Sequence, residues 1–173
     1  MVIVRTFGDA IVSQELSKEA WKKLSLEFKW NEELLRKYRD EIDWDALSEN
    51  TNMLWTASIL DEFEGYINWK GLSIYAPSGL LTPKIIEQFT NRWDWHELSD
   101  NNNLKLTYAL LDKFANKWDW ERIINRWRGA ESYTCEFLER YKEYIPADQF
   151  KDSYLWDALV DKRAAELEQE IME

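Results

Sequence analysis

The residues of this sequence that could do chemistry are mainly carboxylates that stand beside tryptophans. One short phrase recurs along the chain, and its Trp follows Asp43, Asn68, Asp94 or Asp119. Repeated carboxylates could serve as the acid and base of a hydrolase. Because Asn68 replaces Asp in one copy, and because each of these residues precedes a short helical stretch, we interpret them instead as helix N-caps.

Counting residues excludes most other catalytic and metal-binding sites. The chain has a single His, His96, and a single Cys, Cys135. Thiolate or imidazole metal sites with three or four ligands cannot be built from them within one chain. No phosphate-binding loop is present, because the 5 glycines stand singly. We predict that His96 is an ordinary surface residue, that Cys135 is a small core residue, and that the protein is not an enzyme and has no cofactor or metal.

The repeated phrase itself is the strongest structural signal, because it returns about every 25 residues. Its copies cover residues 42–48, 67–73, 93–99 and 118–124, with a partial copy at 21–25. Such a period is typical of stacked repeat proteins, in which each unit buries its apolar face against its neighbours. The predicted core residues of the repeats are Trp21, Trp44, Trp69, Trp95 and Trp120.

A second helix is predicted before each phrase. Apolar residues stand four and three positions before an aromatic residue, on one face of a helix. The aromatic residues are Tyr38, Phe63, Phe89, Phe114 and Tyr141. Seven positions before each aromatic is a residue that favours helix N-caps, and the five are Asn31, Thr56, Thr82, Thr107 and Thr134. An apolar residue before each cap completes a hydrophobic staple.

These signals predict an all-α fold of about five stacked repeats, each a short helix, a loop and a second helix. The expected arrangement is α-solenoid-like, with a long C-terminal capping helix. We assign residues 1–173 to a single helical-repeat domain. Within it, residues 1–12 form an extended arm, because Val2 to Phe7 are β-prone, residues 13–150 form the repeats, and residues 151–173 form the capping helix.

The 11 Trp residues raise a question of hydrogen bonding. A buried indole N–H needs an acceptor. The Ser that ends each phrase and the Asn-rich loops near Asn50 and Asn101 are the candidate acceptors.

Acidic charge is concentrated in the second repeat and in the C-terminal helix. The formal net charge of the chain is -11, and no Lys or Arg occurs between Asp40 and Trp69. An acidic surface steers a protein toward basic partners. The predicted partner-binding residues are Asp40, Glu41, Asp45, Glu49, Asp61, Glu62 and Glu64. A solvated, solubilising face explains the same run, and both interpretations stay open.

The fourth repeat is mildly basic instead, through Lys113, Lys117, Arg122, Arg126 and Arg128. We interpret these residues as a solvent-exposed helix face. Direct nucleic-acid binding is not expected, since contacts to phosphates require a basic surface.

The sequence contains no recognisable signal peptide and no apolar run of the roughly 18 residues that a membrane span needs. A single Cys allows no internal disulfide. We therefore expect a cytoplasmic protein that does not insert into membranes.

Residues 93–101 read WDWHELSDN, and Thr107, Leu110, Leu111 and Phe114 follow at the repeat spacing. This pattern resembles the WDWxxLSxN tandem repeats of uncharacterised bacterial and large-DNA-virus proteins. The resemblance covers residues 21 to about 125 and weakens beyond Trp120. It supports a helical-repeat fold and implies no activity or catalytic residue.

The leading functional hypothesis is a non-enzymatic protein-protein binding module that presents an acidic helical-repeat surface to a partner with a basic surface. The alternative is a phage-type, anti-CRISPR-like inhibitor that occupies the basic nucleic-acid channel of a nuclease. Neither hypothesis specifies the oligomeric state.

Overall fold

The computed structural model describes residues 7–126 and 132–172, and every regular element in these ranges is a helix. The predicted all-α fold class, with its repeats and its long C-terminal helix, is confirmed. Contacts between Cα atoms divide the chain into two compact units, Met1–Trp93 and Asp94–Glu173. The assignment of the whole chain to one domain stays a prediction.

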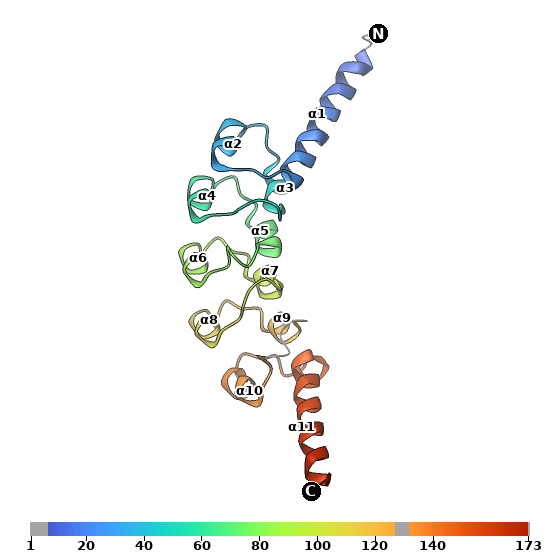
Figure 1. Cartoon of the computed structure of the whole chain (residues 1–173), viewed down its shortest axis with the longest axis vertical. Helices are drawn as coiled ribbons and strands as arrows, with labels where there is room; N and C mark the ends of the chain where they lie inside the picture. Colours follow the sequence, from blue (N-terminus) through green and yellow to red (C-terminus); the bar gives the residue numbers. More distant parts are fainter. Residues whose placement is uncertain (1–6, 127–131, 173) are drawn as a thin grey trace. The chain divides into compact units, whose positions relative to one another are not determined.

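The first unit consists of two rows of helices (Figure 1). Its elements are α1 (Phe7–Glu27), α2 (Glu32–Lys37), α3 (Trp44–Ser48), α4 (Ala57–Glu62), α5 (Trp69–Tyr75) and α6 (Pro83–Gln88). Helices α2, α4 and α6 form one row. The other row consists of α3, α5 and the C-terminal end of α1. Helix α3 packs against α1 on one side and α5 on the other.

The second unit repeats this arrangement. Its elements are α7 (Trp95–Asp100), α8 (Tyr108–Lys113), α9 (Trp120–Ile124), α10 (Cys135–Tyr141), the 3-10 helix η2 (Phe150–Asp152) and α11 (Tyr154–Met172). Helix α7 packs against α9, and η2 packs against α11. Ser153 caps α11, because its Oγ accepts a hydrogen bond from the amide of Trp156 at 3.2 Å.

The helices from α2 to α10 are five to seven residues long, too short to be stable alone in water. Side-chain caps therefore matter for them, and the structure confirms the predicted N-caps in both rows. Each of these nine side chains accepts a hydrogen bond from the amide three residues later: Asn31, Asp43, Thr56, Asn68, Thr82, Asp94, Thr107, Asp119 and Thr134.

The predicted extended arm over residues 1–12 is wrong for residues 7–12, which belong to α1. Residues 1–6 lie outside the described ranges. The physical reason is that residues 14–27 are mostly good helix formers such as Gln, Glu, Leu, Lys and Ala. Once such a helix has nucleated, extending it by a turn costs little.

Each repeated Trp packs against the aromatic residue of the following repeat. The ring centroids of Trp44 and Phe63 are 5.2 Å apart, and those of Trp120 and Tyr141 are 4.8 Å apart. The same contact joins Trp21 to Tyr38, Trp69 to Phe89 and Trp95 to Phe114. Trp120 is buried, and the other four are half-buried. The predicted core Trp residues thus lie at the junctions between repeats, and four of them stand at the edge of the core.

Three of the junctions have at their centre a buried Ser hydroxyl that bonds on both sides. Ser48 is 1% exposed. Its Oγ donates to the Trp44 carbonyl at 2.7 Å and accepts from the amide of Asn68, in the next repeat, at 2.9 Å. Ser25 makes the same pair of bonds with Trp21 and Asp43, as does Ser99 with Trp95 and Asp119. In these three copies the Ser that ends the phrase therefore ties one repeat to the N-cap of the next.

Replacing Ser48 by Ala tests this link. The Asn68 amide loses its acceptor in a buried junction, so we expect the free energy of unfolding to fall by about 1–3 kcal/mol. Chemical denaturation measures this change. Ser58→Ala is the matched control, because Ser58 is an exposed residue of α4 and its loss should change stability by less than about 0.5 kcal/mol. Equal effects of the two substitutions would rule out the link.

The predicted acceptors for the indole N–H groups are wrong for three of the repeated Trp residues. Trp44, Trp69 and Trp120 donate to backbone carbonyl oxygens five residues earlier, at 2.9, 3.1 and 2.8 Å. The hydroxyl of Ser48 instead accepts from the amide of Asn68 in the next repeat. One Asn-rich loop does contribute, because Trp55 Nε1 donates to the backbone oxygen of Asn50 at 3.3 Å.

Polar side chains six residues after the repeated Trp reach back to the preceding repeat. The buried Asn50 donates to the carbonyls of Ser25 and Phe28, at 2.8 and 2.9 Å. Arg126 occupies the equivalent position in the second unit, where it donates to the carbonyls of Ser99, Asn101 and Leu104 at 2.8–3.1 Å. These side chains donate to backbone carbonyls at the C-terminal ends of α1 and α7 and in the loops that follow them.

Within residues 7–126 and 132–172, no helix combines the length and the apolar composition that crossing a membrane would require.

Candidate protein-interaction surface

The acidic residues of α4 and the turn that follows it are used in contacts between repeats. Glu62 forms an ion pair with Arg36 of α2, with an O–N distance of 2.6 Å. Glu64 forms one with Arg92 at 2.5 Å, and Asp61 accepts a hydrogen bond from Gln88 at 3.0 Å. The hydrogen bond from Arg36 lowers the pKa of the Glu62 carboxyl. The sequence places Asp61, Glu62 and Glu64 among the predicted partner-binding residues, but arginines of neighbouring repeats neutralise Glu62 and Glu64 inside the first unit. Asp61 keeps its charge but is engaged by the neutral Gln88.

The other four predicted partner-binding residues surround α3, and we call them the α3 acidic surface: Asp40, Glu41, Asp45 and Glu49. All four are exposed. Asp40 forms an ion pair with its neighbour Arg39, with an O–N distance of 3.2 Å, and 80% of the Asp40 side chain is exposed. Asp45 accepts a hydrogen bond from the neutral Asn68 at 2.8 Å, which leaves its charge in place.

Glu41 and Glu49 form no ion pair with any residue that the structure describes. The backbone holds both in fixed positions. Glu41 lies in a turn, and its backbone amide donates a hydrogen bond to the Tyr38 carbonyl at 3.1 Å. Glu49 ends α3 beside the buried Gly71, where an added Cβ atom would lie 3.4 Å from Cγ of Glu49. Glu41, Asp45 and Glu49 of the α3 acidic surface therefore present carboxylates that no ion pair neutralises within the described residues, whereas Asp40 pairs with Arg39.

The basic residues of the fourth repeat do not form one solvent-exposed face, and the prediction is wrong for Arg126. Its side chain is buried and its three carbonyl partners surround the guanidinium. Burial lowers the pKa of Arg126. Lys113, Lys117 and Arg122 keep exposed or half-exposed positions, while Arg128 lies outside the described residues.

The single Cys and the single His both lie on the surface. Cys135 is exposed, so the prediction of a core residue is wrong. It occupies the first position of α10, whose buried side is formed by Phe137 and Tyr141. His96 is an exposed surface residue, and its Nδ1 lies 2.5 Å from Asp119 Oδ2. Within the described ranges, no group of three or more His, Cys, Asp or Glu side chains could hold a metal ion.

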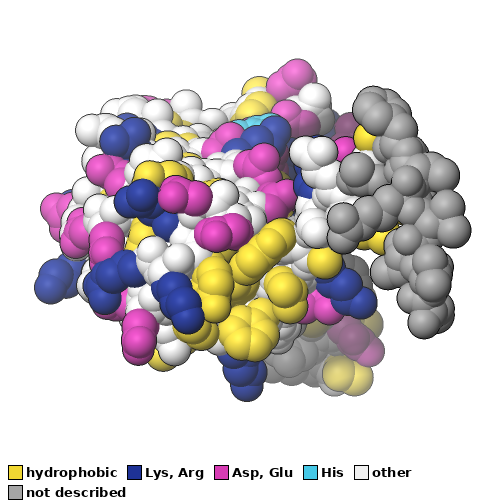
Figure 2. All heavy atoms as spheres, turned by 90° about the horizontal axis from the view of Figure 1, so that it is seen from above, with side chains coloured by type: hydrophobic (Ala, Val, Ile, Leu, Met, Phe, Trp, Pro, Cys, Tyr) yellow, Lys and Arg dark blue, Asp and Glu magenta, His cyan; other side chains and the backbone are white. Residues whose placement is uncertain are grey.

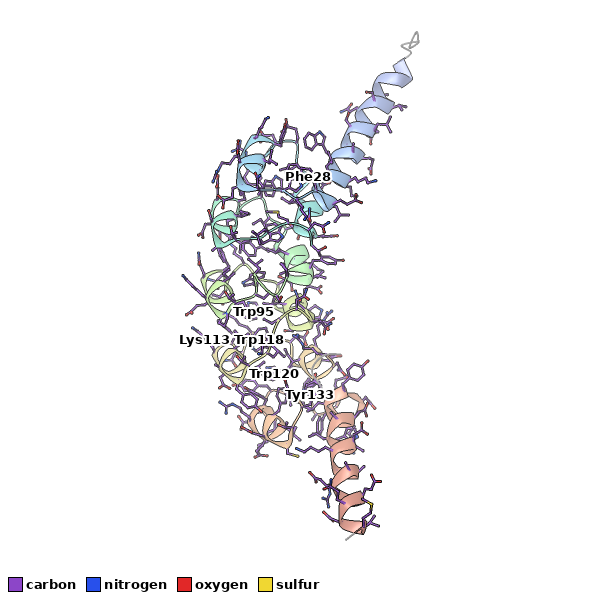
Figure 3. All side chains as sticks on the ribbon, in the orientation of Figure 1. Phe28, Trp95, Lys113, Trp118, Trp120 and Tyr133 are labelled. Atoms are coloured by element: carbon purple, nitrogen blue, oxygen red, sulfur yellow. The ribbon has the colours of Figure 1, made fainter. Side chains whose placement is uncertain are left out.

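The repeat pattern gives no signal for one surface feature, the exposed apolar side of α1. Leu24 is 46% exposed, although Leu47, Leu72, Leu98 and Ile123, at the same position of the phrase, are 0% exposed. Phe28, between α1 and α2 (Figure 3), is also exposed. The spacing of four residues between Val12, Leu16, Ala20 and Leu24 is the signal that identifies this side of α1 in the sequence.

Comparisons of the chain with models of protein families, with curated proteins and with solved structures find no match. The resemblance to WDWxxLSxN repeats therefore stays a prediction.

Proposed function

We propose that the protein is a non-enzymatic binding module that uses the α3 acidic surface to contact a basic patch on a partner protein. The observation that carries this proposal is the exposure of Asp40, Glu41, Asp45 and Glu49 beside a buried junction, with Glu41 and Glu49 free of ion pairs among the described residues. Such carboxylates can pair with a partner's Lys or Arg without first breaking internal ion pairs.

The use of the other conspicuous carboxylates supports the non-enzymatic part of the proposal. Asp43, Asp94 and Asp119 accept hydrogen bonds from helix amides, so the phrase uses them as structural caps. A cytoplasmic location stays part of the proposal.

The test is an affinity capture from a lysate of the source organism, with partners identified by quantitative mass spectrometry. The test variant carries Asp40→Lys, Glu41→Lys and Glu49→Lys. The control variant carries Asp157→Lys, Asp161→Lys and Glu168→Lys on α11, which changes the net charge by the same amount. We expect the partner to be lost with the test variant and kept with the control. Equal retention by both variants would contradict the proposal.

Nuclease treatment and salt define the class of partner. A protein contact survives nuclease treatment, and contact through exposed charges weakens as salt rises from about 0.1 to 0.5 M, because screening shortens the range of the attraction. A captured nucleic-acid enzyme released by salt would place the α3 acidic surface in a basic nucleic-acid channel, as the inhibitor hypothesis requires. A partner held equally at both salt concentrations would contradict the electrostatic contact.

A further inference from the structure

Helix α1 extends beyond the helices that it packs against. Its C-terminal end contacts α3, whereas its N-terminal half stands clear of the other helices of the first unit (Figure 1). All side chains from 11 to 20 are exposed, including Ile11 at 53%, Val12 at 57% and Leu16 at 66%. An isolated helix of this length gains little from its own hydrogen bonds, so a partner that covers its apolar side would stabilise it.

The apolar side of α1 continues into a groove at the end of the first unit. Val12, Leu16, Ala20 and Leu24 follow one another at intervals of four residues, which places them along one side of the helix. The groove has a volume of about 400 Å³ and is lined by Trp21, Leu24, Phe28, Trp30, Leu34 and Tyr38. In Figure 2, which looks onto this end from above Figure 1, hydrophobic side chains gather in a patch bordered by charged ones.

The repeats themselves show what kind of element covers this face. Leu47 holds the position of Leu24 in the next repeat and is fully buried, in the helix that α1 packs against. The face that Leu24 leaves open is therefore shaped to receive a helix with an apolar side. The N-terminal half of α1 is such a helix, and it is free.

The charges of α1 favour a second copy of the same helix in antiparallel orientation. Between residues 11 and 19 the charged side chains are Glu15, Lys18 and Glu19, whereas between residues 20 and 29 they are Lys22, Lys23, Glu27 and Lys29. No ion pair joins these side chains to any described residue. Antiparallel pairing places the acidic half of each helix beside the basic half of the other, a complementarity that a two-fold interface requires.

We propose that the protein forms a two-fold symmetric dimer in which the α1 helices of two copies pair antiparallel. Val12 and Leu16 of each copy cover the groove beside Leu24 of the other. The small residues Ser17 and Ala20 lie near the crossing point, where they allow the two helices to approach closely. Glu15 and Glu19 of one copy lie beside Lys22 and Lys23 of the other.

Sedimentation velocity of the full chain over a range of concentrations tests this dimer. Leu16→Glu places a charge at the centre of the interface twice, once per copy, and should weaken the dimer at least about 100-fold. Ile171→Glu is the matched control, since Ile171 is 83% exposed on α11 and the same charge is added. Circular dichroism should show that both variants keep the helices of the repeats, with any loss in Leu16→Glu limited to the N-terminal half of α1. A chain that stays monomeric at about 100 µM, where a micromolar dimer would be saturated, overturns the proposal.

Charge reversal tests the orientation of the helices. Glu15→Lys with Glu19→Lys should weaken the dimer about tenfold, because basic residues then face each other along the pair. Adding Lys22→Glu and Lys23→Glu to the same chain should restore it. A dimer that survives Leu16→Glu, or that both Leu16→Glu and Ile171→Glu abolish, contradicts pairing through α1. Failure of the fourfold variant to recover contradicts the antiparallel arrangement.

Discussion

Replacing Trp120 by Ala should lower the free energy of unfolding of the second unit by about 3–5 kcal/mol, the cost of deleting a buried aromatic side chain. Trp120 is 6% exposed and points from α9 toward α10 (Figure 3). Its ring lies 4.8 Å from that of Tyr141 and 5.3 Å from that of Tyr144. Its removal opens the junction between two repeats, and chemical denaturation followed by circular dichroism measures the loss.

Trp120→Phe separates the ring contact from the hydrogen bond of the indole. Phe keeps an aromatic ring against Tyr141 but loses the bond from Nε1 to the Ala115 carbonyl. The loss of stability should therefore be clearly smaller than with Ala. If Trp120→Ala left the unfolding midpoint unchanged, the repeated Trp could not be the element that joins successive repeats.

Replacing Arg126 by Ala should cost about 2–6 kcal/mol, although the residue touches no carboxylate in the described part of the chain. The buried carbonyl oxygens of Ser99 and Leu104 lose the guanidinium as donor, and each unsatisfied buried group costs about 1–3 kcal/mol. The Asn101 carbonyl keeps the Leu104 amide as a donor, at 3.0 Å. The guanidinium is 3% exposed and holds these carbonyls at 2.8–3.1 Å. The free energy of unfolding from urea titration is the quantity to measure.

Arg122→Ala is the control for Arg126. Arg122 is only partly buried and forms ion pairs with Glu97 and Asp100 at 3.5 and 3.4 Å. Ion pairs of this kind contribute about 0–1 kcal/mol. Arg126→Lys should give an intermediate loss, because an ammonium lacks the planar, branched set of donors that reaches three carbonyls. Equal losses from Arg122→Ala and Arg126→Ala would contradict a structural role for the buried guanidinium.

The local features of the fold could be predicted because short-range physical chemistry sets them. An N-cap such as Thr56 or Asp43 bonds to an amide three residues later, so its partner is visible in the sequence. The same holds for the apolar residues that form the buried side of each short helix. For this reason the caps, the repeat period and the all-α class follow from the residues alone.

Contacts between repeats could not be predicted, because they join residues that are far apart in the sequence and depend on how the helices pack. Glu62 looks like a free carboxylate in a run without Lys or Arg, but Arg36 comes from the preceding repeat and pairs with it. The sequence alone suggests that Arg126 is exposed to solvent. In the structure it is buried and donates hydrogen bonds to the carbonyls of Ser99 and Leu104. Leu47 and Leu24 stand at the same position of the phrase, but Leu47 is buried and Leu24 is exposed. This difference likewise depends on packing, because α1 packs against the helix of Leu47 and no described repeat precedes Leu24.

The carboxylates of the acidic run fall into two groups. Seven carboxylates were equivalent candidates in the sequence, but the structure separates Asp61, Glu62 and Glu64, which bind residues of other repeats, from the α3 acidic surface. A variant that reverses Glu62 or Glu64 would disturb contacts between repeats as well as any partner site. Reversal of Asp40, Glu41 and Glu49 avoids the ion pairs to Arg36 and Arg92.

Amide hydrogen exchange measured by NMR tests most directly whether buried Ser hydroxyls join successive repeats into the frame that presents the α3 acidic surface. The amides of Asp43, Asn68 and Asp119 each donate to a Ser of the preceding repeat. We expect these three amides to exchange as slowly as the most protected helix amides of their own unit, and the Asn68 amide to lose its protection in Ser48→Ala. Exchange of these amides at the rate of exposed loop amides would contradict the link between repeats.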